Sequence, residues 1–208
     1  MRAPVKLFLA SSNPGKLAEY RALAGTDAAG VAATSHARPE IEWLPGFDSL
    51  PSFEEGAPTF AENAAGKALH YSRRGEGLVF ADDSGLVVPA LRGAPGVHSA
   101  RYAGANATNA ERIAKLLGEL HGKAGGQREA YFVCAIALAE RGRAIAVVTA
   151  CVDGEILESP RGSGGFGYDP VFYFPALKKT FAELLAEEKN QISHRGKAFR
   201  KVLFSLRS

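Results

Sequence analysis

The fold is decided by residues 131–156, "YFVCAIALAERGRAIAVVTACVDGEI". Two apolar runs, 131–139 and 144–156, flank the short polar stretch "ERGR". Runs of this kind, separated by a short turn that contains glycine, are typical of a β-hairpin. We therefore predict two buried antiparallel strands in this central part of the chain.

Strands and helices alternate on the N-terminal side of the hairpin. The segment "VKLFLA" (5–10) is typical of a buried strand, and a short helix follows it. Asn13 suits the N-cap of that helix and Pro14 its first position. Residues 36–58 show no sustained period, so we expect a long irregular excursion there.

One capping signature, T-x-x-E, marks three helix starts, at 59–62, 108–111 and 180–183. Helices that alternate with strands, together with a central hairpin, predict an α/β fold with a mixed central β-sheet flanked by helices. No internal repeat or clear linker divides the chain, so we predict one domain over residues 1–208.

Composition describes an ordinary globular protein. The chain has 208 residues, 46% of them apolar and 23% charged, with a formal net charge of +3. That charge is too small to indicate a nucleic-acid partner. No segment reaches membrane-spanning length, and two cysteines in apolar runs indicate a reduced pair. We expect a cytoplasmic protein that binds neither nucleic acid nor membrane.

Residues 11–16, "SSNPGK", follow a strand and open a helix. Backbone N–H groups at a helix start, together with Lys16, form a suitable phosphate cradle. The stretch is not a Walker A loop, because the first glycine is missing and Leu17 replaces Ser or Thr. A well-capped turn with a solvated lysine is the alternative interpretation.

Two acidic stretches are candidate magnesium ligands. Glu54 and Glu55 precede a helix start, where the helix dipole alone would favour them. Asp82 and Asp83 lie between apolar runs in "LVFADDSGLVV" (78–88), where we expect them to end a strand. If strand geometry persists through both, their side chains point to opposite faces. A bound cation would offset the repulsion between neighbouring carboxylates.

The loop "GSGGFGYDP" (162–170) fits G-x-G-x-x-G, but no helix-like run follows and Pro170 comes too soon. We therefore reject a dinucleotide fingerprint. Phe166 or Tyr168 could stack on a base, or both could fill the core.

The C-terminal segment 187–207 places Arg195 on the apolar stripe of a helix that Ser193 is suited to cap. An arginine there has donors for phosphate oxygens or purine acceptor edges. His194 and Lys189 could serve the same ligand.

Five segments in register resemble the inosine triphosphate pyrophosphatases, a family that hydrolyses non-standard purine nucleoside triphosphates. They are "SSNPGK", "EEGAPTFAENAAGKA", "ADDSGLVVPALRGAPGVHSARYAG", "GGFGYDPVF" and "EEKNQISHRGKA", and they span residues 11–198. The opening loop departs slightly: it reads Ser11-Ser12 where the family more often has Thr-Gly or Thr-Ser.

The resemblance implies an elongated, two-lobed fold with a central cleft, assembled as a homodimer. It also implies Mg²⁺-dependent hydrolysis of dITP, ITP and XTP to the nucleoside monophosphate and pyrophosphate, which would keep deaminated purines out of DNA and RNA. By this resemblance Glu54 and Asp83 are metal ligands, and Asp83 also accepts the proton of the attacking water. Asp82 is its neighbour or a second ligand.

Carried over residue by residue, the resemblance implies these nucleotide contacts: Ser11, Ser12, Asn13, Pro14, Gly15, Lys16, Ser84, Phe166, Gly167, Tyr168, Asp169, Lys189, His194 and Arg195. Asn63, Lys67 and Arg101 lie in matching segments without an assigned role. Hypoxanthine and xanthine present an acceptor at position 6, which donors from His194 and Arg195 would favour over the amino group of adenine.

Two other functions stay open. A related pyrophosphatase could act on pyrimidine or modified triphosphates, although the "SHR" and "FGYDP" elements are against it. A nucleotide sensor or nucleic-acid-binding module would not need the Glu54 and Asp83 pair, and its polynucleotide affinity would depend strongly on salt.

Overall fold

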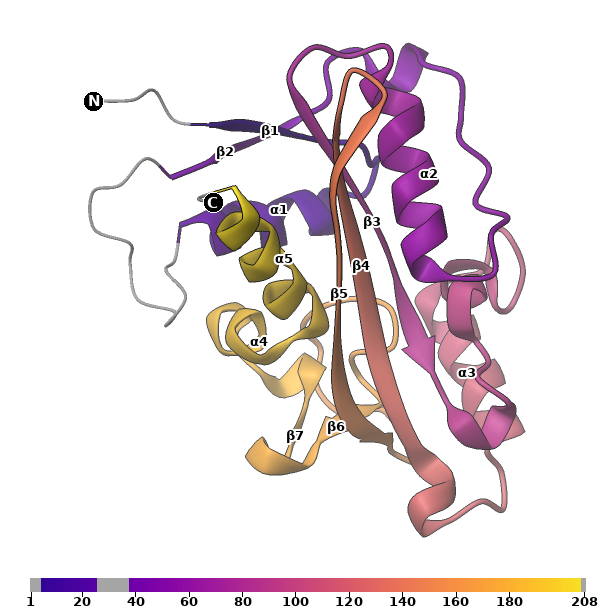
Figure 1. Ribbon diagram of the computed structural model, residues 1–208. Coiled ribbons are helices and arrows are strands. Elements are labelled where there is room, and N and C mark those ends of the chain that lie inside the picture. The colour runs from indigo at the N-terminus through magenta and orange to yellow at the C-terminus, as the bar shows by residue number, and fades with distance from the viewer. Residues whose placement is uncertain (1–4, 26–37, 207–208) are drawn as a thin grey trace. The chain divides into compact units, whose positions relative to one another are not determined.

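A computed structural model describes residues 5–25 and 38–206. The strands form one seven-stranded sheet in the order β2-β1-β3-β4-β5-β6-β7 (Figure 1). Their bounds are β1 Lys6–Leu9, β2 Glu40–Trp43, β3 Leu78–Val87, β4 Glu129–Glu140, β5 Arg143–Ile156, β6 Phe172–Phe174 and β7 Lys179–Thr180. β1 pairs in parallel with β2 and β3, whereas β6 pairs antiparallel with β5 and β7. The mixed-sheet α/β prediction is confirmed.

The helices are α1 Pro14–Ala24, α2 Phe60–Ser72, α3 Asn109–Glu119, α4 Ala186–Ile192 and α5 His194–Ser205. Short 3-10 helices lie at Phe47–Ser49, Pro89–Leu91, Gly96–Arg101, Gly125–Arg128, Pro175–Leu177 and Phe181–Glu183. In the part of the chain that the structure describes, no helix is both long and apolar enough to cross a membrane.

The chain forms two compact units. Unit 1 consists of Met1–Asp83, Cys134–Ala150 and Arg195–Ser208, and unit 2 of Ser84–Val133 and Cys151–His194. The long strands β3, β4 and β5 each contribute residues to both units. The single-domain interpretation and the central cleft stay predictions.

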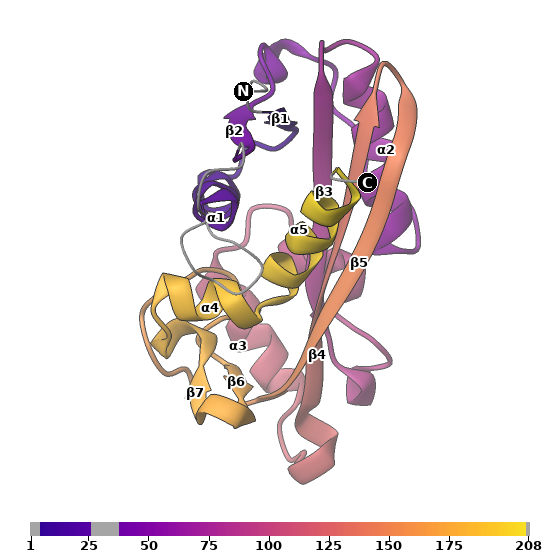
Figure 2. The same cartoon turned by 60° about the vertical axis from the view of Figure 1, so that its left-hand side comes forward.

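Unit 1 has helices on both faces of its part of the sheet, as Figures 1 and 2 show for α1 and α5 on one face and α2 on the other. The side-chain alternation of β4 supplies both layers. Cys134, Ile136 and Leu138 pack with apolar residues of α1 and α5. Ala135, Ala137 and Ala139 pack with α2. Small residues on one face and larger ones on the other therefore give β4 its continuous apolar run.

Unit 2 has a core of its own, to which α3 contributes Ile113 and Leu116 and its C-cap contributes Leu120. The rings of Phe132, Phe172 and Phe181 form its aromatic centre, with centroids 4.5 to 5.8 Å apart. Arg128 is buried beside this core, and its guanidinium donates to the carbonyl oxygens of Leu120, Lys123, Ile156 and Leu157. This one side chain satisfies the C-terminal end of α3 and the end of β5.

The capping predictions are confirmed for the first three helices. The Asn13 side chain accepts from the backbone N–H groups of Gly15 and Lys16, and Pro14 begins α1. Thr59 and Thr108 cap α2 and α3. At Thr180 the capping box forms, but the helix it opens is only the 3-10 turn Phe181–Glu183. Leu184 is extended because this turn buries Phe181 and Ala182, and an α-helix begins only at Ala186.

Three sequence expectations about strands were wrong. β2 lies within the segment 36–58 that was predicted to be irregular, and it was missed because "EIEW" (40–43) is too short to show a period. Residues 36 and 37 of that segment lie outside the described ranges. β3 does not end at the aspartates but continues to Val87. β5 is not buried on both faces, since Ile145 and Val147 are 50% and 45% exposed.

Candidate active site

The loop before α1 is held by its own polar groups. The Ser11 hydroxyl oxygen accepts from the Asn13 N–H at 3.1 Å, and Asn13 Oδ1 accepts from the Gly15 N–H at 2.9 Å. The Lys16 side chain leaves the first turn of α1 toward β3, where its Nζ lies 2.9 Å from Asp82 Oδ1. The lysine of the predicted phosphate loop is therefore paired and only 16% exposed, so the solvated-lysine alternative is wrong.

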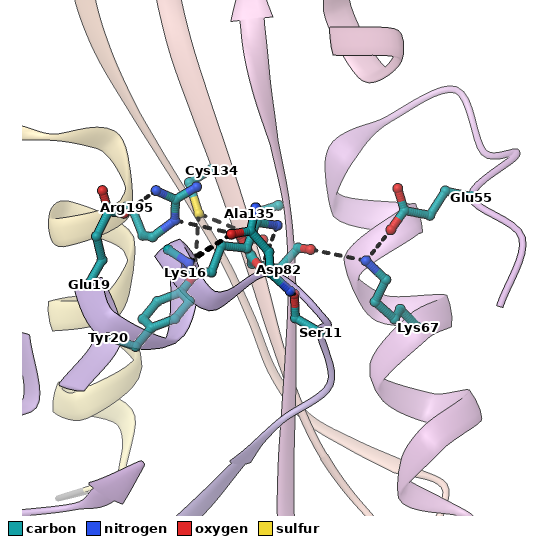
Figure 3. A network of polar contacts seen from close by, with 12 residues as sticks. Ser11, Lys16, Glu19, Tyr20, Glu55, Lys67, Asp82, Cys134, Ala135 and Arg195 are labelled. Atoms are coloured by element: carbon teal, nitrogen blue, oxygen red, sulfur yellow. Dashed lines mark hydrogen bonds and ion pairs between the residues drawn. The ribbon is translucent and has the colours of Figure 1, made fainter. Parts of the chain in front are cut away.

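The adjacent aspartates of β3 direct their side chains to opposite sides of the strand, as expected where a strand continues through both. Asp82 meets Lys16 of α1 and Arg195 of α5, whereas Asp83 meets Asn63 of α2. Figure 3 shows Asp82 with α1 and α5 on one side and Lys67 of α2 on the other. The double aspartate thus serves two separate polar groups.

Asp82 is the buried acid of the first group, with a side chain 0% exposed. Burial opposes its ionisation, but Lys16, Arg195 and Lys67 outweigh that effect and hold the pKa of Asp82 below its usual value. Arg195 Nε lies 3.7 Å from Asp82 Oδ2, and the Arg195 Nη1 donates to Glu19 Oε2. Both acids raise the pKa of Arg195 although its burial acts in the opposite direction.

Asp83 is the acid of the second group and is 7% exposed. The Asn63 Nδ2 donates to Asp83 Oδ2 at 3.0 Å, and the Asn63 carboxamide is itself fixed by the backbone of Ala57. Burial, followed by the negative charge of Glu55, raises the pKa of Asp83 to about 6. Asp83 is therefore a carboxylate able to take up a proton near neutral pH.

Glu55, rather than Glu54, belongs to this second group. Glu54 is exposed, whereas Glu55 is partly buried and forms an ion pair with Lys67. The Lys67 Nζ also donates to the Asp82 carbonyl oxygen at 3.4 Å (Figure 3). Within residues 5–25 and 38–206, no three His, Cys, Asp or Glu side chains gather as a ready metal site. The negative charge of Glu55 nevertheless reaches Asp83, and one or two carboxylates are the donors that Mg²⁺ commonly takes from a protein.

Unit 2 holds its own buried ion pair on the glycine-rich loop. The Lys189 Nζ lies 2.6 Å from Asp169 Oδ2, with side-chain exposures of 7% and 4%. The same oxygen accepts from the Phe166 N–H at 2.8 Å, and the Lys189 ammonium lies 5.0 Å from the centroid of the Phe166 ring. Gly165 has φ +69° and faces Asp169 so closely that a Cβ would overlap the carboxylate. The glycine is thus required by the ion pair.

Two other predicted nucleotide-contact residues of unit 2, Tyr168 and His194, pack against the backbone or an aromatic ring. Tyr168 is buried, and its hydroxyl donates to the Ser99 carbonyl at 3.0 Å. The His194 imidazole stacks on the Phe132 ring, with centroids 4.7 Å apart and planes 13° from parallel. Ser84 follows Asp83 in β3 and is partly buried. Gly167, at φ +64°, completes the loop beside Phe166.

Sequence reasoning missed the residues that hold the predicted ones. Glu19 and Phe132 were given no role, and Glu55 was considered only together with Glu54 as a candidate magnesium ligand. A cavity of about 510 Å³ was also not expected; it is lined by Ser11 and Ser12 of the loop and by residues 43–49, Trp43 among them.

The fold and the site define a mixed α/β protein with two buried acid–base groups, one on either side of β3. Comparison with known proteins gives the family: residues 7–204 match the model of the Ham1 family. The chain is 53% identical to a dITP/XTP pyrophosphatase of Geobacillus kaustophilus over 95% of this chain and 92% of the relative. A dITP/XTP pyrophosphatase of Gloeobacter violaceus is 51% identical over the same shares.

A solved structure of a HAM1 protein from Coxiella burnetii matches with a TM-score of 0.82 and 43% identity, covering 98% of each chain. The chain therefore belongs to the Ham1 family, and the resemblance drawn from the five sequence segments is confirmed.

The raised pKa of Asp83 makes stability depend on pH. A carboxyl group with a pKa of about 6 in the folded state and 3.8 unfolded binds more protons when folded, so its contribution falls as pH rises between those values. We expect Asp83→Asn, without divalent cations, to raise the free energy of unfolding by at most about 3 kcal/mol at about pH 8, and to leave it unchanged at about pH 3. Urea unfolding followed by circular dichroism measures this difference.

A matched variant tests the cause. Glu55→Gln removes the second contributor to the raised pKa of Asp83. The stability of this variant should therefore stop declining at a lower pH than that of the wild type. A variant Asp83→Asn that is less stable than wild type at the higher pH would contradict the assigned protonation.

Proposed function

We propose that this chain is a nucleoside triphosphate pyrophosphatase that hydrolyses dITP, ITP and XTP to the nucleoside monophosphate and pyrophosphate. The observation that carries the proposal is Asp83: a buried carboxylate with a pKa of about 6 beside Asn63, in a member of a family whose relatives are named dITP/XTP pyrophosphatase. Such an enzyme removes deaminated purine nucleotides before polymerases can use them.

The residues around Asp83 fit a magnesium ion. Asp83 and Glu55 repel one another in a site that burial has partly dehydrated, and a divalent cation would relieve that repulsion. As the resemblance implies, Asp83 and Glu54 would hold the ion, whereas Glu55, the neighbour of Glu54, is engaged by Lys67. When bound, Mg²⁺ supplies charge neutralisation at phosphate oxygens and a lowered pKa for water.

The chain's own groups would bind, orient and accept a proton. Lys16 has three ammonium N–H donors, one of them directed to Asp82, and we assign the other two to phosphate oxygens; the backbone N–H groups of Gly15 and Lys16 already donate to Asn13 Oδ1. Asn63 fixes one oxygen of Asp83 and so orients the carboxylate that accepts a proton from the attacking water. Lys67, held by Glu55, adds positive charge beside the same carboxylate.

We assign the choice between purine bases to hydrogen-bond donors of the protein. His194 and Arg195 would donate to an acceptor at position 6 of hypoxanthine or xanthine, whereas the amino group of adenine would present these donors with another donor. Lys189 is assigned to the same nucleotide. The ring of Phe166 is half-buried beside the Lys189 ammonium, and we assign it to stacking on a base. Homodimeric assembly and a cytoplasmic location are further parts of the proposal, and they rest on the resemblance.

The test is release of pyrophosphate, counted separately from orthophosphate, from dITP, ITP, XTP, dGTP, dATP and dTTP, with and without Mg²⁺. We expect Mg²⁺-dependent release from the first three, with a kcat/KM at least about 100-fold above that for dATP, as is usual where a site hydrogen-bonds the distinguishing group. Glu54→Gln should raise the Mg²⁺ requirement, whereas Asp153→Asn, at an exposed position on β5, should leave it unchanged. Release mainly from dTTP would indicate the pyrimidine activity, and binding without hydrolysis would indicate a sensor.

A further inference from the structure

We propose that Asp82 is a positioning residue that orients Lys16 and Arg195 together, and that it is not a ligand of the metal ion. The inference rests on the proposed function, because it concerns the same nucleotide. It also explains why two aspartates adjoin in β3: one serves the reaction and the other holds two basic groups.

Both carboxylate oxygens of Asp82 face cations of the protein. Oδ1 lies 2.9 Å from Lys16 Nζ and Oδ2 lies 3.7 Å from Arg195 Nε, and the side chain is 0% exposed. A magnesium ligand must instead offer oxygens toward the ion and its waters. Because side chains alternate along a strand, Asp82 also points away from the side on which Asp83 contacts Asn63.

The two cations come from distant parts of the chain. Lys16 lies in the first turn of α1 and Arg195 in the first turn of α5, so their side chains share no backbone constraint. Glu19, one turn after Lys16 on α1, contacts the opposite part of the Arg195 guanidinium. The row Lys16, Asp82, Arg195, Glu19 alternates in sign, and Asp82 contacts both of its cations (Figure 3).

This arrangement couples two recognition tasks. Phosphate oxygens that draw Lys16 toward them change how strongly Asp82 attracts Arg195, because one carboxylate is shared. Binding at the phosphate end should therefore alter the placement of the guanidinium, and a phosphate chain without a base should be sensitive to substitutions of Asp82.

The experiment uses the full chain with Asp82→Asn, which preserves the shape and removes the charge. We expect the KM for dITP to rise about 10- to 100-fold, as when a group that orients a direct ligand is lost. The Mg²⁺ concentration that gives half the maximal rate at saturating dITP should stay within about twofold of wild type, which is the scatter of independent sites. An increase in that Mg²⁺ concentration, or an unchanged KM, would overturn the proposal.

A second readout needs no turnover. Calorimetric binding of inorganic tripolyphosphate should weaken in Asp82→Asn and in Lys16→Met, and the double variant should lose much less than the product of the two effects. Asp153→Asn, which makes the same chemical change at an exposed position on β5, is the matched control and should bind tripolyphosphate as wild type does. Multiplicative effects of the two substitutions would contradict coupling.

Two further outcomes separate the proposed function from the proposed role of Asp82. If wild type hydrolyses no triphosphate and binds no tripolyphosphate, the proposed function fails; if wild type does both and Asp82→Asn equals it, only the role of Asp82 fails. Should Asp82→Asn not fold by circular dichroism, the cycle is repeated with Lys16→Met and Arg195→Met. Non-additive tripolyphosphate binding then supports coupling through Asp82, and additive binding rejects it.

Discussion

Replacing Asp83 by Asn is expected to lower kcat for dITP about 1000-fold or more, since a positioned base alone contributes roughly 100- to 10,000-fold. The amide keeps the volume of the side chain and an oxygen for Asn63, but it neither ionises nor accepts a proton. Added Mg²⁺ should not restore the rate, because the substitution removes the proton acceptor as well as a proposed metal ligand. Steady-state release of pyrophosphate, with kcat and KM fitted separately, measures the effect.

The control for Asp83→Asn is Asp153→Asn, which makes the same chemical change at an exposed position on β5 and should leave kcat unchanged. Asp83→Asn should also be the more stable protein at about pH 8, as derived above from its pKa. An inactive but less stable variant would indicate misfolding, and a kcat within tenfold of wild type would remove Asp83 from its assigned role.

Replacing Asp169 by Ala is expected to destabilise the protein by about 3–5 kcal/mol, the usual cost of leaving one member of a buried ion pair without its partner. The Lys189 ammonium and the Phe166 N–H both lose their acceptor. Asp169→Asn, which keeps an acceptor oxygen, should cost less. Urea unfolding followed by circular dichroism measures both variants.

The double variant Asp169→Leu with Lys189→Met separates structure from binding. Replacing a buried ion pair by apolar side chains of similar volume is often neutral for stability, so most of the loss should be recovered. The KM for dITP should nevertheless stay raised, because Lys189 is assigned to the nucleotide. A double variant with wild-type KM would show that Lys189 only holds the loop, and one as unstable as Asp169→Ala would show that other contacts of Asp169 dominate.

Local signals predicted much of the fold. Asn13 followed by Pro14 and the Thr–Glu pairs at 59–62 and 108–111 act within one helical turn, so they can be recognised without knowledge of the tertiary structure. The same pair at 180–183 opens only a 3-10 turn, because burial of Phe181 overrides the local preference. β2 was missed because its four residues become a strand only by pairing with β1.

The site was predictable as a set of segments but not as a set of contacts. Residue types identified Lys16, Asp83, Lys189 and Arg195 as chemically useful, whereas their partners depend on which strand face and which helix meet. Asp82 and Asp83 could not be told apart until β3 was seen to continue through both. Likewise, the resemblance chose Glu54 from the adjacent pair, but only the structure shows that Glu55 forms the ion pair with Lys67.

The chain contains a single tryptophan, and it lies beside the loop of residues 11–16. Trp43 is 36% exposed on the rim of the cavity that Ser11 and Ser12 also line. Indole emission depends on contact with water, so one natural fluorophore reports on this corner of unit 1 without background from elsewhere. The wild-type protein therefore has an optical signal of its own for following, in real time, what enters and leaves beside the loop.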